Sequence, residues 1–395
     1  MEKESLTLFS KSYSLRKLPY PHIVVSSKKE IHGWWGGRRE CTGERFLLNP
    51  YSGCSVGCFY CYARSFPGWF QLFRKRGIVV VAEEFHKAVA RQLDSIDIAA
   101  CGYLSPVTDP FQPLNREFRL AEKIIVEFSK RNIPIEFITK CRVPDEVLNI
   151  LKGNEHNFGQ ISILTPDEKI SRILAPRGAG VDILFENIAR ISAKGIFSVI
   201  RIDPILPFIT DSREDLANLI RKAKKSGAKH VISSVLDIPQ VIREEILEFI
   251  KRNFGFDIYI KYKGLYTEKI SGYLNADLNY RIKIFDFLKR EVLKNGMSFA
   301  LCMEHRILKD GNLKGLNKEY MSSDNCEGIN IPLYRRRGDK FYPAADCPGN
   351  CLNCEDPICG VDDLAMGEPG SKKDWKLKDY KRWSAMIKLK SYEDK

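Results

Sequence analysis

The stretch that decides the fold reads Asn49-Pro-Tyr-Ser-Gly-Cys54-Ser-Val-Gly-Cys58-Phe-Tyr-Cys61-Tyr62. Its three cysteines have the spacing C-x3-C-x2-C and directly follow a short apolar run, Phe46–Leu48, that is typical of a buried strand. Three thiolates on a 4Fe–4S cluster leave one iron without a protein ligand, and an open position is what binding a cofactor or substrate requires. Gly53 and Gly57 allow the backbone to wrap closely around such a cluster. The alternative is a zinc knuckle with a distant fourth ligand, but the position after the first strand of a repeated pattern favours the cluster.

From this loop onward, the chain alternates between apolar runs and helical patterns. The runs that we expect to be buried strands are Phe46–Leu48, Cys101–Leu104, Ile133–Ile138, Ile161–Leu164, Phe197–Ile202 and His230–Val235. One helical face is marked by Leu216, Leu219, Ile220 and Ala223, and Gly227 stands where that helix should end. Repeated strand–helix units predict a parallel sheet with right-handed crossovers. The pattern alone fits an open doubly wound sheet as well as a barrel.

The sequence divides into five regions. Residues 1–45 are expected to form an N-terminal extension, and residues 46–255 carry the strand–helix repeats. Residues 256–325 are expected to form a helical, aromatic-rich insertion that ends in one more strand, Ser298–Cys302. Tyrosines in this insertion either fill a secondary core or stack on nucleic-acid bases. Residues 326–362 are a cysteine-rich metal-binding segment, and residues 363–395 form a basic tail.

Composition indicates the partners and the compartment. The 395-residue chain has 63 Lys and Arg against 50 Asp and Glu, a net charge of +13. Such an excess favours polyanionic partners, although a solvated lysine-rich surface gives the same charge. The run Arg335–Arg337 is one candidate for phosphate contacts. An acidic, polar start and the lack of a long apolar stretch favour the cytoplasm and exclude a membrane partner.

Twelve cysteines in a reducing compartment indicate metal ligands rather than disulfides. A second tight group near the C-terminus consists of Cys347, Cys351, Cys354 and Cys359. Four thiolates so close together can complete a metal shell, either of structural zinc or of a second 4Fe–4S cluster, and we favour the cluster. Cys302 and Cys326 could substitute or add. The scattered Cys41, Cys101 and Cys141 are expected to be small buried apolar residues.

Five further motifs follow the cysteine loop, each at or just after an expected strand. They are Thr108–Pro113 (TDPFQP), Ile138–Lys140 (ITK), Ser162–Thr165 (SILT), Arg172 with Ala175–Arg177 (APR), and Arg201–Pro207 (RIDPILP). Together with the loop, this ordered set resembles the radical S-adenosylmethionine (SAM) superfamily, and more closely its spore photoproduct lyase-like family, over roughly residues 46–240. The resemblance implies an α/β fold with a partial (β/α)6 barrel.

The resemblance also implies roles for individual residues. Cys54, Cys58 and Cys61 correspond to the cluster ligands. The cofactor-binding residues that it implies are Thr108, Asp109, Lys140, Ser162 and Arg201. Among these, Lys140 corresponds to a lysine that pairs with the SAM carboxylate. Tyr60 and Tyr62 are expected to be catalytic, because tyrosines take part in hydrogen-atom transfer in the lyase. Where the lyase has a cysteine hydrogen donor this sequence has Pro106, so repair of spore photoproduct is not predicted.

The activity that the resemblance implies is reductive cleavage of SAM to a 5′-deoxyadenosyl radical, which abstracts hydrogen from a substrate. Charge and family favour a nucleic acid as substrate, in modification or repair. A peptide or protein is the alternative, because auxiliary clusters often accompany peptide-modifying radical enzymes. A third hypothesis is a non-catalytic Fe–S or zinc protein that binds nucleic acid. The catalytic hypotheses require a reducing partner such as ferredoxin or flavodoxin.

Overall fold

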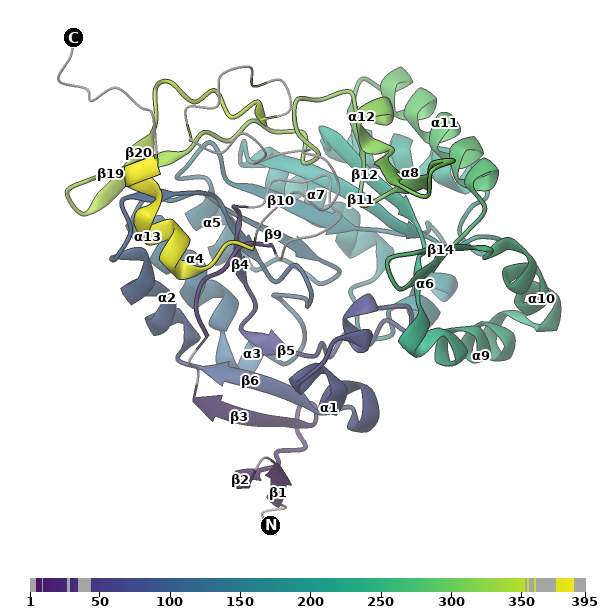
Figure 1. Cartoon of the computed structure of the whole chain (residues 1–395), viewed down its shortest axis with the longest axis horizontal. Coiled ribbons are helices and arrows are strands. Elements are labelled where there is room, and N and C mark those ends of the chain that lie inside the picture. Colours follow the sequence, from purple (N-terminus) through teal and green to yellow (C-terminus); the bar gives the residue numbers. More distant parts are fainter. Residues whose placement is uncertain are drawn as a thin grey trace.

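The computed structural model describes residues 5–8, 10–26, 29–34, 44–351, 354, 359 and 374–386, so Cys41 lies outside the described residues. Its centre is one sheet of seven parallel strands (Figure 1). In spatial order they are β4 (Phe46–Leu48), β8 (Gly102–Leu104), β9 (Ile135–Thr139), β10 (Phe158–Ser162), β11 (Phe197–Ile205), β12 (His230–Val235) and β16 (Ser298–Leu301). Each expected strand has a counterpart in the sheet, and the one expected at Ser298–Cys302 extends it beside β12. The bounds expected for Ile161–Leu164 were wrong, because β10 begins three residues earlier and ends at Ser162.

The spatial order of the strands decides between the two architectures that the alternation left open. Each strand lies beside the one that follows it in the sheet's chain order, whereas a doubly wound sheet reverses direction part-way. Successive right-handed crossovers then place the helices on one face of the sheet. These are α2 (Phe85–Leu93), α4 (Leu120–Lys130), α5 (Asp145–Leu151), α7 (Val181–Ala193), α8 (Arg213–Ser226) and α11 (Leu278–Lys294). The fold is therefore the α/β partial barrel that the resemblance implied.

Helix α8 illustrates how the sequence determines these elements. The Ser212 hydroxyl accepts a hydrogen bond from the Asp215 backbone N–H at 3.4 Å and caps the first turn. Leu216, Leu219 and Ile220 share the buried face. Each such side chain, when removed from water, stabilises the fold by about 1.5–3 kcal/mol. Gly227 ends the helix at φ +101°, a conformation that a side chain at Cβ disfavours.

The two faces of the sheet differ in polarity. On the helix-facing side, a Cβ at Gly102 would lie 2.6 Å from the Phe128 ring of α4, and one at Gly159 would lie 2.9 Å from Ile191 of α7. Because side chains alternate along a strand, the neighbouring Tyr103 and Gln160 point to the inner face. Polar and charged side chains along the inner face make it a place for chemistry rather than a second apolar core.

Part of the region expected to be an N-terminal extension is built into the fold. Strand β3 (His22–Ser26) pairs in parallel with β6 (Val79–Glu83), which also pairs with β5 (Tyr51–Ser52). The chain before β3 forms a hairpin of β1 (Ser5–Leu8) and β2 (Lys11–Ser14). This small sheet lies beside α1 (Trp69–Arg76), below the main sheet in Figure 1.

Residues 238–275, which include the start of the region expected to be an aromatic-rich insertion, fold as a helical pair and a small sheet. The helices are α9 (Arg243–Phe254) and α10 (Phe256–Leu265), and the strands are β13 (Ile238–Pro239), β14 (Glu268–Ile270) and β15 (Tyr273–Asn275). The remaining short elements are η1 (Tyr62–Ser65), α3 (Asn115–Phe118), α6 (Glu168–Leu174), η2 (Gln240–Ile242), β17 (His305–Ile307), β18 (Leu313–Gly315) and α12 (Asn317–Tyr320). Among the described residues, no helix combines the length and the apolar composition needed to cross a membrane.

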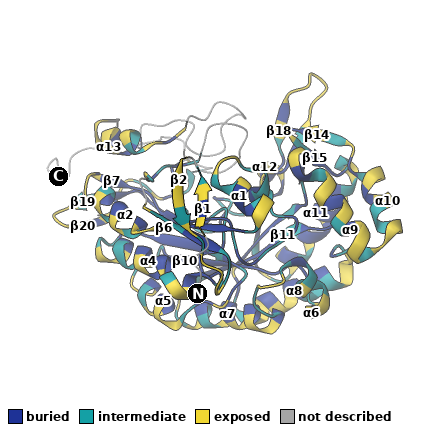
Figure 2. Cartoon of the chain, turned by 90° about the horizontal axis from the view of Figure 1, so that it is seen from below, coloured by how far each residue is buried: buried dark blue, intermediate teal, exposed yellow. Residues whose placement is uncertain are grey.

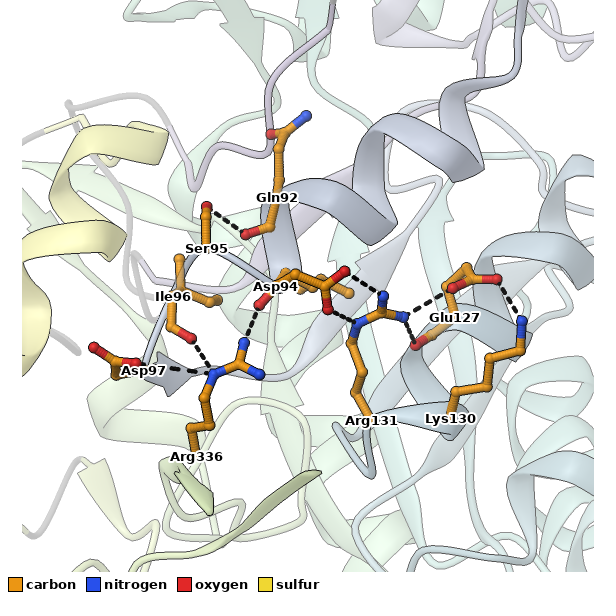
Figure 3. A network of polar contacts seen from close by, with 10 residues as sticks. Gln92, Asp94, Ser95, Ile96, Asp97, Glu127, Lys130, Arg131 and Arg336 are labelled. Carbon is orange, nitrogen blue, oxygen red and sulfur yellow. Dashed lines mark hydrogen bonds and ion pairs between the residues drawn. The ribbon is translucent and has the colours of Figure 1, made fainter. Parts of the chain in front are cut away.

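The cysteine-rich segment packs on the barrel through a hairpin of β19 (Tyr334–Arg337) and β20 (Lys340–Pro343), and β19 pairs with β7 (Ile98–Ala99). Arg336 donates to the carbonyl oxygens of Leu93 and Ile96, at 2.5 and 2.8 Å. Figure 3 shows the contact with Ile96. Arg336 therefore holds the hairpin to the end of α2 and has protein partners in place of the phosphates that the basic run suggested. Beside it, Arg131 links Asp94 and Glu127.

The described part of the tail, α13 (Leu377–Met386), also packs on the body. Tyr380 and Trp383 are fully buried. The Tyr380 hydroxyl donates to the Glu44 carbonyl at 2.9 Å, and the Trp383 indole donates to the Cys359 carbonyl at 3.0 Å. This part of the basic tail therefore covers the start of β4.

Candidate active site

The cysteine loop follows β4 and the short β5 at the carboxyl end of the main parallel sheet, the edge at which parallel α/β folds hold their sites. Gly53 and Gly57 have φ values of +98° and +82°, and a Cβ at Gly53 would lie 2.8 Å from the Phe73 side chain. The loop is held by two of the other motifs. The Ser55 backbone N–H donates to Gln112 Oε1 at 2.7 Å, and the Arg177 N–H donates to the Val56 carbonyl at 3.2 Å. The motifs that are separate in sequence thus meet around one loop.

The thiols of Cys54, Cys58 and Cys61 are half-buried and lie near one another, so that each interacts electrostatically with the others. Burial and the neighbouring Cys58 raise the pKa of Cys61 to about 11. Burial also raises the pKa of Cys58, and Lys140 opposes this rise. Metal binding requires the thiolate form, so a metal that binds these three thiols displaces protons held by the buried site.

Asp109 organises the loops around this site. Its carboxylate accepts hydrogen bonds from the Thr139 hydroxyl at 2.8 Å, the Lys140 N–H at 2.7 Å and the Phe111 N–H at 2.9 Å. Burial raises the pKa of Asp109, and these hydrogen bonds oppose the rise. Asp109 therefore ties the loop after β8 to the end of β9, which places Lys140.

Lys140 and Ser162 meet at the ends of adjacent strands β9 and β10. Lys140 Nζ lies 2.5 Å from Ser162 Oγ and 6.0 Å from the centre of the Tyr60 ring. These three residues line a pocket together with Ala175 and Gly178. A Cβ at Gly178 would lie 3.1 Å from the Lys140 carbonyl oxygen, so glycine allows the two backbone segments to approach closely here. The pocket places a cation and a hydroxyl beside the cysteine loop, as a ligand with a carboxylate requires.

Thr108 lies in the same region, at the start of the TDPFQP motif. Its hydroxyl oxygen is buried and has no hydrogen-bond partner among the described residues. A buried hydroxyl without a partner costs free energy unless a ligand satisfies it. Thr108 is therefore available to a ligand, in contrast to Asp109.

Arg201 belongs to the inner wall of the barrel and is surrounded by protein partners. It donates to Gln160 Oε1 at 2.9 Å, to Asp203 Oδ2 at 3.1 Å from Nε, and to Cys302 Sγ at 3.1 Å. Burial raises the pKa of Asp203, but Arg201 and the Ser234 hydroxyl outweigh it, so the pKa lies below its usual value. Arg201 thus holds an ionised carboxylate and a thiol on the wall that faces the space above the sheet.

Known proteins of similar sequence point to the same kind of site. Residues 48–223 match the family model of the radical SAM superfamily. They are a radical SAM domain. The protein is also 27% identical over 363 residues to a protein of Pseudomonas phage M6 named radical SAM Nalpha-GlyT isomerase, which covers 86% of this chain and 75% of the relative. An uncharacterised protein of Methanocaldococcus jannaschii is 23% identical over 189 residues, 48% of this chain and 69% of its own length.

Among solved structures, the radical SAM domain and its surroundings resemble spore photoproduct lyase. A lyase variant with bound AdoMet and dinucleoside spore photoproduct superposes with a TM-score of 0.54 and 12% identity, over 71% of this chain and 81% of that one. A second lyase variant gives the same values. This likeness confirms the fold. The family match over residues 48–223 and the similarity to the phage isomerase indicate an enzyme that carries a radical SAM domain.

The donor set of the radical SAM domain fits a 4Fe–4S cluster and SAM. The three thiols come from one loop, in which two glycines adopt positive φ angles. The Thr108 hydroxyl, which has no partner among the described residues, and the Lys140 ammonium lie beside this loop. Among the described residues, no three His, Cys, Asp or Glu side chains are close enough to hold a single metal ion. A cubane binds its cysteines at different corners, so its ligands stand farther apart than those of one ion. The assignment of Cys54, Cys58 and Cys61 as ligands stays a prediction that this geometry supports.

The two expected catalytic tyrosines occupy different places. Tyr60 is buried, and its hydroxyl lies beside the Cys58 thiol. The Tyr62 hydroxyl donates to the Pro106 carbonyl at 3.0 Å, and Cys302 lies near enough to influence its pKa, which burial raises. Tyr62 therefore links the cysteine loop to the inner wall, through the residue that stands where the lyase has its cysteine.

Cys302 lies beside Arg201 on the inner wall of the barrel, a position that could not be predicted from the sequence. From the sequence it was considered only as an additional or alternative metal ligand. Burial raises the pKa of this thiol to about 11, and Arg201 opposes that rise. Sequence reasoning also missed Asp203, although the pattern Arg201-Ile-Asp203 places both charged residues on one face of a strand. Asp237 was missed as well: burial and the neighbouring Glu304 and Asp203 raise its pKa to about 7.

The second cysteine group lies at the other end of β4 from the cysteine loop. Cys351 interacts electrostatically with Glu44 and Arg45, which directly precede β4, and with Cys347 and Cys359. Cys347 Sγ accepts a hydrogen bond from the Leu333 N–H at 3.4 Å, and Cys347 and Cys354 also influence each other. The four cysteines are thus neighbours at the amino ends of the strands. The metal that they hold remains a prediction.

Proposed function

We propose that this radical SAM enzyme modifies a nucleotide of a nucleic acid by a redox-neutral rearrangement. The observation that carries the proposal is the similarity to the phage isomerase, which extends over 86% of the chain and so beyond the radical SAM domain. The net charge of +13 supports a polyanionic substrate. The lyase that shares this fold was solved with a dinucleoside photoproduct, which shows that the fold admits such a ligand there.

The chemistry that the cofactors supply when bound is the reductive cleavage of SAM to methionine and a 5′-deoxyadenosyl radical. The contribution of this chain is to bind and to orient. Lys140 offers its ammonium to the carboxylate of the ligand, and Ser162 and Thr108 offer hydroxyls. Asp109 keeps Lys140 in place through the backbone. Phe59 of the cysteine loop stacks on Phe249 of α9 with ring centres 4.0 Å apart, which excludes water from that side.

An isomerisation keeps all atoms of the substrate, so the hydrogen that is removed must be returned. Tyr62 and Cys302 stand at the inner wall near the cysteine loop. Burial raises the pKa of both groups, so the O–H and S–H hydrogens are retained at neutral pH. The abstracted hydrogen atom leaves on 5′-deoxyadenosine, and we propose that Tyr62 donates its O–H hydrogen atom to the rearranged substrate radical in its place. One electron from the reducing partner and one proton from solvent then restore the tyrosine, and Arg201 and Asp203 position the wall beside it.

Three further points belong to the proposal. A ferredoxin or flavodoxin supplies the electron, which suits a cytoplasmic enzyme.

The cysteines at the amino end of the sheet hold a second 4Fe–4S cluster, a proposal that their mutual proximity supports. Because these cysteines adjoin the start of β4 while the cysteine loop follows its end, the second cluster would stabilise the closed end of the barrel rather than contact the substrate.

The test is coupling between SAM cleavage and nucleic acid. Reconstituted enzyme, SAM and reductant are incubated anaerobically with DNA, RNA or peptide pools, and 5′-deoxyadenosine and digested nucleosides are measured by mass spectrometry. We expect one nucleic-acid pool to stimulate 5′-deoxyadenosine formation and to yield a nucleoside of unchanged mass and altered retention. Stimulation by peptides alone would contradict the proposal.

A further inference from the structure

Helix α10, which packs on α9, carries exposed aromatic and apolar side chains. In this helix only Tyr262 is buried, although most of its residues are apolar. Phe256 is 59% exposed and Ile260 48% exposed. Contiguous apolar patches on the surface of a monomer often mark binding sites. Figure 2 shows α9 and α10 at the periphery of the molecule, with much of α10 exposed.

Helix α10 is connected to the active site through α9. Besides the stacking of Phe59 on Phe249, Glu245 at the start of α9 accepts hydrogen bonds from Arg64 at 3.1 Å and from Arg74 at 2.7 Å. Arg64 lies in η1, directly after the cysteine loop. A ligand that rests on α10 would therefore be held at a fixed position relative to the cysteine loop, through α9.

Phe208 joins this surface from the inner-wall strand. It follows β11, is 38% exposed, and has a φ of +62°, which is uncommon for an aromatic residue and costs backbone energy. The turn that imposes this conformation is closed by the Thr210 hydroxyl, which accepts from the Leu206 N–H at 2.9 Å. The Phe208 ring lies 6.3 Å from that of Tyr262 on α10. We define the α10 platform as Phe208, Phe256, Tyr259 and Ile260.

Lysines surround the rings of the α10 platform. Lys261 Nζ lies 5.5 Å from the centre of the Phe208 ring, and Lys263 Nζ lies 5.5 Å from that of Tyr259. Lys251 Nζ lies 6.0 Å from the Phe256 ring. Between residues 251 and 263 the chain has four basic side chains and one acidic side chain. Exposed rings beside ammonium groups offer stacking to bases and charge to the adjacent phosphates.

We propose that the α10 platform binds the nucleic-acid strand that flanks the target nucleotide, with rings stacked on bases and Lys251, Lys261 and Lys263 near phosphates. The inference rests on the proposed function, because it supplies the docking surface for that substrate. An acidic electron-carrier protein would also meet the lysines. The platform favours nucleic acid because apolar rings, rather than hydrogen-bonding groups, fill the space between the charges.

The experiment measures binding of fluorescein-labelled single-stranded DNA, duplex DNA and RNA to the cluster-loaded full chain by anisotropy at several salt concentrations. One variant is Phe256→Ala with Ile260→Ala, and the other is Lys261→Glu with Lys263→Glu. The matched control is Lys222→Glu with Lys225→Glu on α8, where Lys222 also lies over a ring, that of Phe185, at 5.5 Å. All four lysines are exposed, so the charge change and the folding demands are similar.

We expect the apolar variant to bind the preferred nucleic acid about five- to a hundredfold more weakly, the loss for one or more stacked bases. The lysine variant should reduce the slope of log K against log salt by about 1.4 for a single strand. The α8 control should bind like the parent. Basal SAM cleavage without nucleic acid should stay unchanged in all variants.

Three results would overturn the inference in distinguishable ways. If the parent binds nucleic acid and the platform variants bind it equally well, the α10 platform is not the binding surface, and the proposed function stands. If the platform variants bind nucleic acid normally but are reduced more slowly by flavodoxin, the surface docks the electron donor. If the parent binds no nucleic acid at all, the proposed substrate class fails together with the platform.

Discussion

The positive charge of Lys140 provides a quantitative test of the cofactor pocket. Lys140→Met keeps most of the side-chain length beside the Tyr60 ring and removes the ammonium that lies 2.5 Å from Ser162 Oγ. A hydrogen bond to a charged group contributes about 1.5–3 kcal/mol. Its loss should weaken the binding of SAM by roughly ten- to 150-fold. The backbone N–H of Lys140 still bonds Asp109, so the loop itself should keep its shape.

The assay is the dissociation constant for SAM, measured anaerobically on cluster-loaded protein together with its iron content. Iron should equal that of the parent, because the variant leaves Cys54, Cys58 and Cys61 untouched. Lys169→Met on α6 is the matched control, since Lys169 is exposed and the same charge is lost. An unchanged dissociation constant for Lys140→Met, or an equal loss for Lys169→Met, would refute the reasoning.

Three other changes test separate parts of the structure. In the folded protein, burial raises the pKa of Asp237 to about 7, whereas in the unfolded chain this carboxyl group ionises from about pH 4. Between about pH 4 and 7 the unfolded state loses this proton while the folded state keeps it, so the stability of the fold falls as the pH rises. The melting temperature of Asp237→Asn relative to the parent should therefore rise from pH 5 to 7 and stay level above it; a difference that does not change with pH would exclude Asp237. Gly53→Ala should lose cluster iron while keeping its circular dichroism, because the new Cβ meets Phe73 at 2.8 Å; full iron retention would contradict this. Alanine at Cys54, Cys58 and Cys61 together should leave about half the iron if the C-terminal cysteines hold a second cubane. Complete loss of iron with one zinc retained would make that site a zinc site.

Much of the barrel could be predicted from the sequence because buried parallel strands are continuous apolar runs. The runs at Phe46–Leu48 and His230–Val235 coincide with β4 and β12 at both ends. The small sheet of β3, β5 and β6 was not predicted. β3 and β6 come from segments more than fifty residues apart, and β5 has only two residues, too few for a visible period.

The candidate site was predictable where a motif has its own spacing, as in the cysteine loop, and less so where function depends on register. Gln160 and Arg201 come from two adjacent strands and Cys302 directly follows a third, β16. Only the order of these strands in the sheet brings the three side chains into contact. Likewise, nothing local in the sequence shows that the second cysteine group lies at the amino end of β4, because long-range packing determines this.

The measurement that tests the central claim most directly is the formation of 5′-deoxyadenosine. Anaerobically reconstituted protein is given SAM and a strong reductant, and the product is quantified by chromatography. We expect the parent to form it and Cys58→Ala to form none, because two thiolates cannot hold the cluster in its open-iron geometry. Cys101→Ala, which removes a buried thiol outside both cysteine groups, should retain the parent's activity. Product from Cys58→Ala at the parent's rate, or no product from a parent that contains its cluster, would contradict the account.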